Sequence, residues 1–82
     1  MSYEKVAQAA NKVVGTKQTL KALENEQVKE LIVAEDADQK VLEKALQIAQ
    51  GKGVSVHPVD SMKKLGKACG IDVNAAIVAI KK

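Results

Sequence analysis

The chain has 82 residues, of which 46% are hydrophobic, so it suits one domain over residues 1–82 and is not disordered by composition. Its net charge is +3, all of its basic residues are lysines, and residues 1–21, 22–50 and 51–82 carry +3, −4 and +4, so both ends are basic. A single cysteine excludes an internal disulfide, and with neither a signal peptide nor a membrane-length apolar run we expect a cytoplasmic protein without membrane contact.

The first half of the chain is predicted to contain two helices and two strands. Residues 3–12 form a short amphipathic helix, and residues 12–15 form a short apolar strand. A second helix is expected over residues 17–24. After a polar turn, residues 28–36 read as a β-branched strand with a nearly continuous apolar run, which indicates that both of its faces are covered.

The second half repeats this alternation. A third helix over residues 39–53 begins behind the cap Asp38, and residues 54–59 alternate as a strand. A fourth helix is predicted over residues 62–70, and residues 71–80 form a last apolar strand. The order of elements places the chain in the α/β class and predicts a three-layer α/β/α sandwich with a mixed four-stranded sheet.

Two of the predicted helices begin with lysine behind a hydroxyl cap. Thr16 is expected to cap the second helix, and Lys17 follows it directly. Ser61 is expected to cap the fourth helix, whose first turn holds Lys63 and Lys64. Each positive charge opposes the helix dipole by about 0.3–1 kcal/mol, whereas a phosphate bound at the free first-turn amides would reverse that sign. The pattern favours a polyanion site, although solvated lysines that maintain solubility are the alternative.

The remaining polar residues do not form a catalytic constellation. The only histidine, His57, precedes Pro58 on a strand and is read as an edge-strand side chain. Cys69 lies on the apolar side of its helix and is expected to be buried, and Gly66 is expected to let a neighbour pack closely. We therefore expect no enzyme activity, no metal site and no cofactor.

Two stretches of the sequence carry a family resemblance. "VVGTKQTLKAL" and "SMKKLGKACGIDVNAAIVAI" resemble the L7Ae/L30e ribosomal protein family, over essentially the whole chain. Members of that family bind kink-turns, which are RNA duplexes sharply bent at a bulge flanked by sheared G·A pairs. The resemblance implies that the start of the second helix enters the groove at those pairs, with contacts from Gly15, Thr16, Lys17, Gln18 and Lys21.

The loop after the fourth helix is the second part of the implied RNA site. By resemblance, Ile71, Asp72 and Val73 pack against the flipped-out bases of the bulge, although the hydrophobic pair could instead lead into the last strand. The archaeal branch of the family has Asn-Glu at the positions of Lys17 and Gln18, so this chain offers an amide oxygen where that branch offers a carboxylate.

Two functional hypotheses follow. The first is a monomeric RNA-binding module for kink-turns in ribosomal or riboswitch RNA, associated with the ribosome or similar to a ribosomal protein. Because the chain has no arginine and only one aromatic residue, its recognition should depend mainly on RNA shape and backbone charge. The alternative is a protein-interaction domain of the same fold, in which the lysines meet an acidic partner.

Overall fold

The computed structural model describes residues 2–82, and helices alternate with strands along them. The helices are α1 (Ser2–Gln8), α2 (Thr16–Glu24), α3 (Gln39–Lys52) and α4 (Met62–Ala68), and the strands are β1 (Lys12–Val14), β2 (Val28–Ala34), β3 (Ser55–Val59) and β4 (Ile77–Lys81). This is the predicted order. The bounds differ most at the first helix, which ends at Gln8 rather than at residue 12, and at the last strand, which begins at Ile77 rather than at residue 71.

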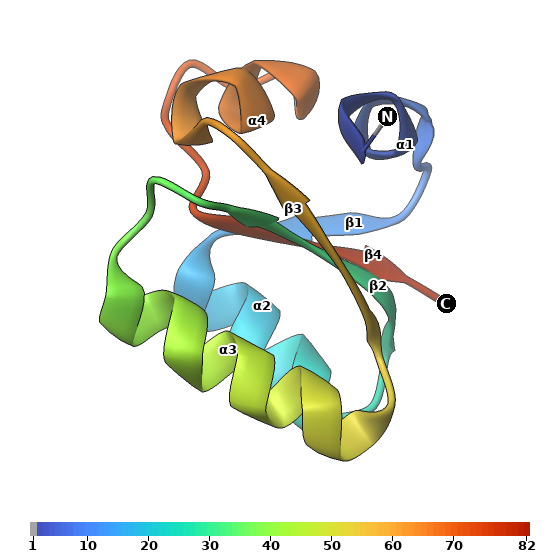
Figure 1. Ribbon diagram of the computed structural model, residues 1–82. Coiled ribbons are helices and arrows are strands. Elements are labelled where there is room, and N and C mark those ends of the chain that lie inside the picture. Colours follow the sequence, from blue (N-terminus) through green and yellow to red (C-terminus); the bar gives the residue numbers. More distant parts are fainter. Residues whose placement is uncertain (1) are drawn as a thin grey trace.

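The four strands form one mixed sheet with the order β1-β4-β2-β3. β4 is antiparallel to both of its neighbours, whereas β2 and β3 are parallel. Helices α1 and α4 cover one face of the sheet, and α2 and α3 cover the other (Figure 1). The prediction of a three-layer α/β/α sandwich with a mixed four-stranded sheet is confirmed.

The core consists of aliphatic side chains from all three layers. Leu31, Ile32, Val33 and Ala34 of β2 are all buried, as expected for a central strand between two helical layers. The largest fully buried aliphatic side chains are Val6, Leu23, Leu31, Ile32, Leu65, Ile77 and Val78. Within residues 2–82 no helix combines the length and the apolar character that crossing a membrane requires.

The lone aromatic residue has a structural role. The Tyr3 hydroxyl donates a hydrogen bond to the Asp60 carboxylate and accepts one from the Ser61 amide at 3.2 Å. These bonds join α1 to the segment that precedes α4, on one face of the sheet. The Tyr3 hydroxyl is thereby bonded within the protein.

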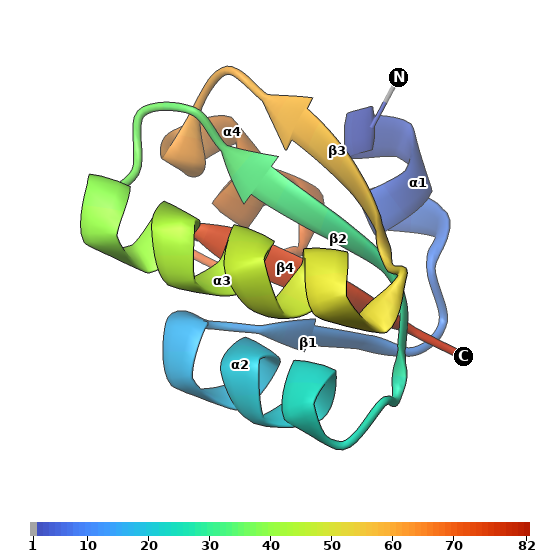
Figure 2. The same cartoon turned by 60° about the horizontal axis from the view of Figure 1, so that its bottom comes forward.

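One edge of the sheet collects the starts of three helices. Val14, at the end of β1, pairs with Val78 near the start of β4, and Val59, at the end of β3, pairs with Ala34 at the end of β2. Because β4 is antiparallel to β2, its first residues lie at this same edge, which we call the carboxyl edge. Helices α2, α3 and α4 therefore begin there, and residues 71–76 enter β4 there (Figure 2).

Candidate functional site

The turn from β1 into α2 is made by a single glycine. Gly15 is the N-cap of α2 and has φ 106° and ψ 145°, a backbone conformation that is accessible mainly to glycine. Thr16 is therefore the first helical residue, and the prediction that its side chain caps the helix is wrong. The physical reason is that Gly15 alone makes the turn from β1 into α2. The helix therefore begins at Thr16, one residue earlier than a Thr16 cap would place it.

This geometry predicts the effect of adding a methyl group at Gly15. Apart from its chain neighbours, no described residue would lie within 4 Å of the new Cβ, so the cost comes from the backbone conformation and not from a clash. We expect Gly15→Ala to lower the free energy of unfolding by roughly 1–3 kcal/mol, measured by urea denaturation. The control is Gly51→Ala in α3, also with open space around its Cβ, which should leave stability unchanged or raise it by up to about 1 kcal/mol.

The first turn of α2 divides its side chains between solvent and core. Lys17 and Gln18 are exposed, whereas Thr19 is fully buried and its hydroxyl donates to the Val13 carbonyl oxygen at 3.3 Å. No side chain of the described residues caps this helix. The N-terminus of α2 thus presents a positive helix dipole and two exposed polar side chains to solvent, while Thr19 ties the helix to β1.

A groove of about 320 Å³ flanks α2 on the side of α3. It is lined by Lys17, Gln18, Leu20, Lys21, Glu24 and Lys44. Lys44 belongs to α3 and was not among the predicted site residues. No sequence pattern indicates it, because its proximity to Lys17 and Lys21 depends on the packing of α3 beside α2.

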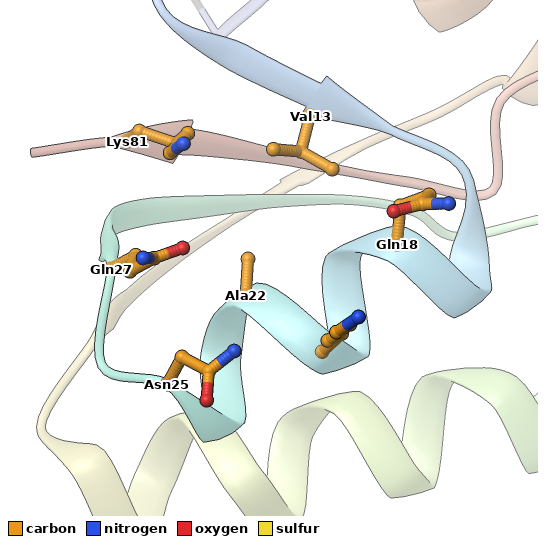
Figure 3. Close-up of a pocket in the computed structure, with 7 residues that line it drawn as sticks. Val13, Gln18, Ala22, Asn25, Gln27 and Lys81 are labelled. Atoms are coloured by element: carbon orange, nitrogen blue, oxygen red, sulfur yellow. The ribbon is translucent and has the colours of Figure 1, made fainter.

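A second groove, of about 230 Å³, lies between α2 and the sheet (Figure 3). Its lining residues are Val13, Gln18, Lys21, Ala22, Asn25, Gln27 and Lys81. Two of these are lysines and three carry carboxamides, and none carries a carboxylate. Gln18 and Lys21 line both grooves, so α2 is flanked by lysine on each side.

The start of α4 differs from the start of α2. The Ser61 hydroxyl oxygen accepts from the Lys64 amide at 3.3 Å, which confirms the predicted cap, and an Asp36 carboxylate oxygen accepts from the Met62 amide at 2.9 Å. The expectation that the first-turn amides of this helix are free for a phosphate therefore does not hold for Met62 and Lys64. Asp36, which follows β2, reaches the tip of α4 because both lie at the carboxyl edge.

The lysines of α4 separate into two environments. Lys63 and Lys67 line a groove of about 160 Å³ together with residues 71–74. Lys64 instead lies beside Asp60, with 3.4 Å between its Nζ and a carboxylate oxygen. The Tyr3 hydroxyl and, to a smaller extent, the Lys64 ammonium hold the pKa of Asp60 below its usual range.

The loop between α4 and β4 exposes a large hydrophobic side chain. Val73 is 67% exposed, whereas Ile71 is partly buried, and both line the groove with Lys63 and Lys67. Because β4 begins at Ile77, both residues precede the last strand, whereas the sequence predicts that it begins at residue 71. Lys67 was missed as a candidate, although it lies one helical turn after Lys63 and its spacing could have indicated it.

The structure also shows the surroundings of His57 and Cys69. His57 lies on the edge strand β3, as predicted, with its Nε2 atom 4.0 Å from a Glu30 carboxylate oxygen. Cys69 is only partly buried rather than fully buried, and burial raises the pKa of its thiol. Among residues 2–82, no group of three or more histidine, cysteine, aspartate or glutamate side chains is arranged to hold a metal ion.

Comparisons with known proteins agree with one another on the kind of protein that this chain resembles. The sequence profile of the ribosomal protein L7Ae/L30e/S12e/Gadd45 family matches residues 1–82. An RNA-binding protein of Halalkalibacterium halodurans is 61% identical over 82 residues, which is all of both chains. The RNA-binding protein YbxF of Geobacillus stearothermophilus is 59% identical over 80 residues, or 98% of each chain. These descriptions name no enzyme, in agreement with the sequence analysis.

Solved structures share the fold. A protein of unknown function from Bacillus halodurans superposes with a TM-score of 0.84 and 26% identity, covering 98% of this chain and 80% of that one. The 15.5 kD RNA binding protein of Giardia lamblia superposes with a TM-score of 0.76 and 27% identity, covering 98% of this chain and 68% of that one.

Proposed function

Because this chain belongs to the ribosomal protein L7Ae/L30e/S12e/Gadd45 family, we propose that it is an RNA-binding protein and that its target is a kink-turn. The relatives that match it over nearly their whole length are named RNA-binding proteins, which supports the first part. The second part depends on the residues at the carboxyl edge. We place the kink-turn in a structured cellular RNA, either ribosomal or of the riboswitch type, bound by one copy of the chain.

The observation that carries the proposal is the start of α2. Among residues 2–82 no side chain caps its N-terminus, and its first turn exposes Lys17 and Gln18. The backbone at Gly15 has open space around it, so a ligand backbone can approach closely. Without a ligand, the lysine opposes the helix dipole. A phosphate near this tip would interact favourably with the dipole and with the ammonium group at once.

The second supporting observation is an exposed apolar side chain at the same edge of the sheet as this charged tip. The loop of residues 71–74 also lies at the carboxyl edge, with Val73 exposed and two lysines beside it. A bent RNA brings two stems and an unpaired bulge to one surface. In our proposal α2 meets the stem with the G·A pairs, and the loop meets an unstacked base of the bulge.

The test compares two RNA hairpins. One contains a kink-turn, and in the other the sheared G·A pairs are replaced by Watson–Crick pairs. We expect the protein to bind the first at least about tenfold more tightly in a gel shift at a stated salt concentration, because only the first can bend. Equal affinity for both hairpins would contradict the kink-turn proposal and leave only general attraction to polyanions. Failure to bind either would favour an acidic protein partner.

The two adjacent lysines of α4 provide a matched pair within the proposed site. Lys63 lines the groove beside the loop, whereas Lys64 is engaged by Asp60. Lys63→Ala should therefore weaken binding of the kink-turn hairpin several-fold, and Lys64→Ala should weaken it less, as measured by fluorescence anisotropy. The two variants have the same net charge, so the difference between their affinities reports the position of each lysine relative to the RNA. A larger loss for Lys64→Ala would mean that the RNA approaches α4 from the side of Asp60.

A further inference from the structure

Gly66 occupies an unusual place in α4. It is buried in the middle of a helix, where glycine is a poor helix former. A Cβ on this residue would overlap the Val73 carbonyl oxygen and would lie 3.1 Å from the Val73 carbonyl carbon and 3.4 Å from the Asn74 Cα. All three are backbone atoms, so no side-chain rotation can relieve the overlap. The loop therefore rests on α4 at a separation that only glycine permits.

Backbone hydrogen bonds hold the loop on either side of this contact. The Ile71 amide donates to the Gly66 carbonyl oxygen at 3.1 Å, and the Ala75 amide donates to the Met62 carbonyl oxygen at 3.0 Å. The segment from 71 to 75 is thus fixed to α4 at both ends, and Gly66 determines how closely its middle approaches the helix. Val73 lies in that middle and directs a hydrophobic side chain that is 67% exposed towards solvent.

We propose that Gly66 is a positioning residue for RNA recognition. It does not touch the RNA in this proposal. It fixes the distance between the loop and α4, and so holds the Val73 side chain where it meets an unstacked base. A loop that is already in its binding position loses little conformational entropy when RNA binds, which favours affinity. This inference rests on the proposed function, since it assumes that Val73 faces RNA.

The experiment compares Gly66→Ala with Gly51→Ala. Both replace a helical glycine by alanine, but a Cβ at Gly51 would meet no atom within 4 Å beyond its chain neighbours and the backbone of its own helix. Affinity is measured for a kink-turn hairpin and for a copy that lacks the bulge. We expect Gly66→Ala to bind the bulged hairpin about tenfold more weakly and the copy almost unchanged, because only the bulge offers a base to Val73. Gly51→Ala should bind both RNAs as the parent does.

A double-mutant cycle tests whether Gly66 acts through Val73. Val73→Ala should itself weaken binding of the bulged hairpin. If Gly66 acts by positioning that side chain, then adding Gly66→Ala to Val73→Ala should cause little further loss. Full additivity would overturn the proposal. A general structural defect would give a third result, because it would weaken binding of both hairpins.

A second variant covers the case in which Gly66→Ala does not fold. Insertion of one glycine between Asp72 and Val73 alters the exposed loop and leaves the buried face of α4 intact. We expect the same selective loss for the bulged hairpin. If the folded variants keep the selectivity of the parent, the positioning role is wrong while the kink-turn proposal stands. If the parent protein itself shows no preference for the kink-turn, both proposals are wrong.

Discussion

Lys17→Glu is expected to abolish detectable binding of kink-turn RNA, with a loss on the order of 100-fold or more. Lys17 is exposed in the first turn of α2, which no side chain of the described part of the chain caps. The substitution would place a carboxylate at the point where a phosphate is proposed to meet the helix dipole. Affinity for the kink-turn hairpin, measured by titration at fixed salt concentration, provides the readout.

The same substitution should leave the folded protein intact. An acidic residue suits the N-terminus of a helix, so Lys17→Glu should raise the free energy of unfolding by a few tenths of a kcal/mol. Lys52→Glu is the control, since it changes the net charge equally at the end of α3, away from the carboxyl edge. It should weaken RNA binding far less than Lys17→Glu does. Normal RNA binding by Lys17→Glu would show that the RNA does not meet the start of α2.

Raising the salt concentration fourfold, from 50 to 200 mM, is expected to weaken binding about 100-fold. Six lysines line the grooves beside α2 and the loop after α4: Lys17, Lys21, Lys44, Lys63, Lys67 and Lys81. If about four of them contact phosphates, counterion release gives a slope near −3 to −4 in a plot of log affinity against log salt. The measurement is a series of titrations at increasing potassium chloride concentration.

Single substitutions identify which lysines contribute to that slope. Lys17→Ala should reduce its magnitude by about one, because one phosphate contact is lost. Lys52→Ala should leave the slope unchanged. A flat plot for the parent protein would contradict the role assigned to the lysines, whatever the affinity at low salt.

Much of the fold could be predicted from the sequence. The alternation of helical and extended periods gives the order of elements and the three layers, and the apolar run in β2 indicates that both faces of this strand are covered. These features are local or depend on composition, since a segment's hydrophobic period reflects how many of its faces are buried. The errors at the first helix and at the last strand concern segments next to loops, where the pattern is weak.

The helix starts were predicted less completely. The hydroxyl of Thr16 suggested a cap, but the backbone conformation of Gly15 decides where α2 begins. The cap of α4 was predicted correctly at Ser61, yet the second acceptor at its tip, Asp36, lies 26 residues earlier in the chain. A contact over that separation depends on which strands are neighbours, and the sequence pattern does not contain this information.

The sequence by itself determined the class of fold, the aliphatic core, and the residues by which the chain resembles its family. These features depend only on the chemistry of the side chains and on their spacing along the chain. Tertiary structure alone decided that Lys44 joins the lysines of α2, that Asp36 reaches the start of α4, and that Gly66 supports the loop that presents Val73. Each of these depends on close approach between elements distant in sequence or on the path of a loop. Such approaches are fixed only when the helices pack on the sheet and its strands pair.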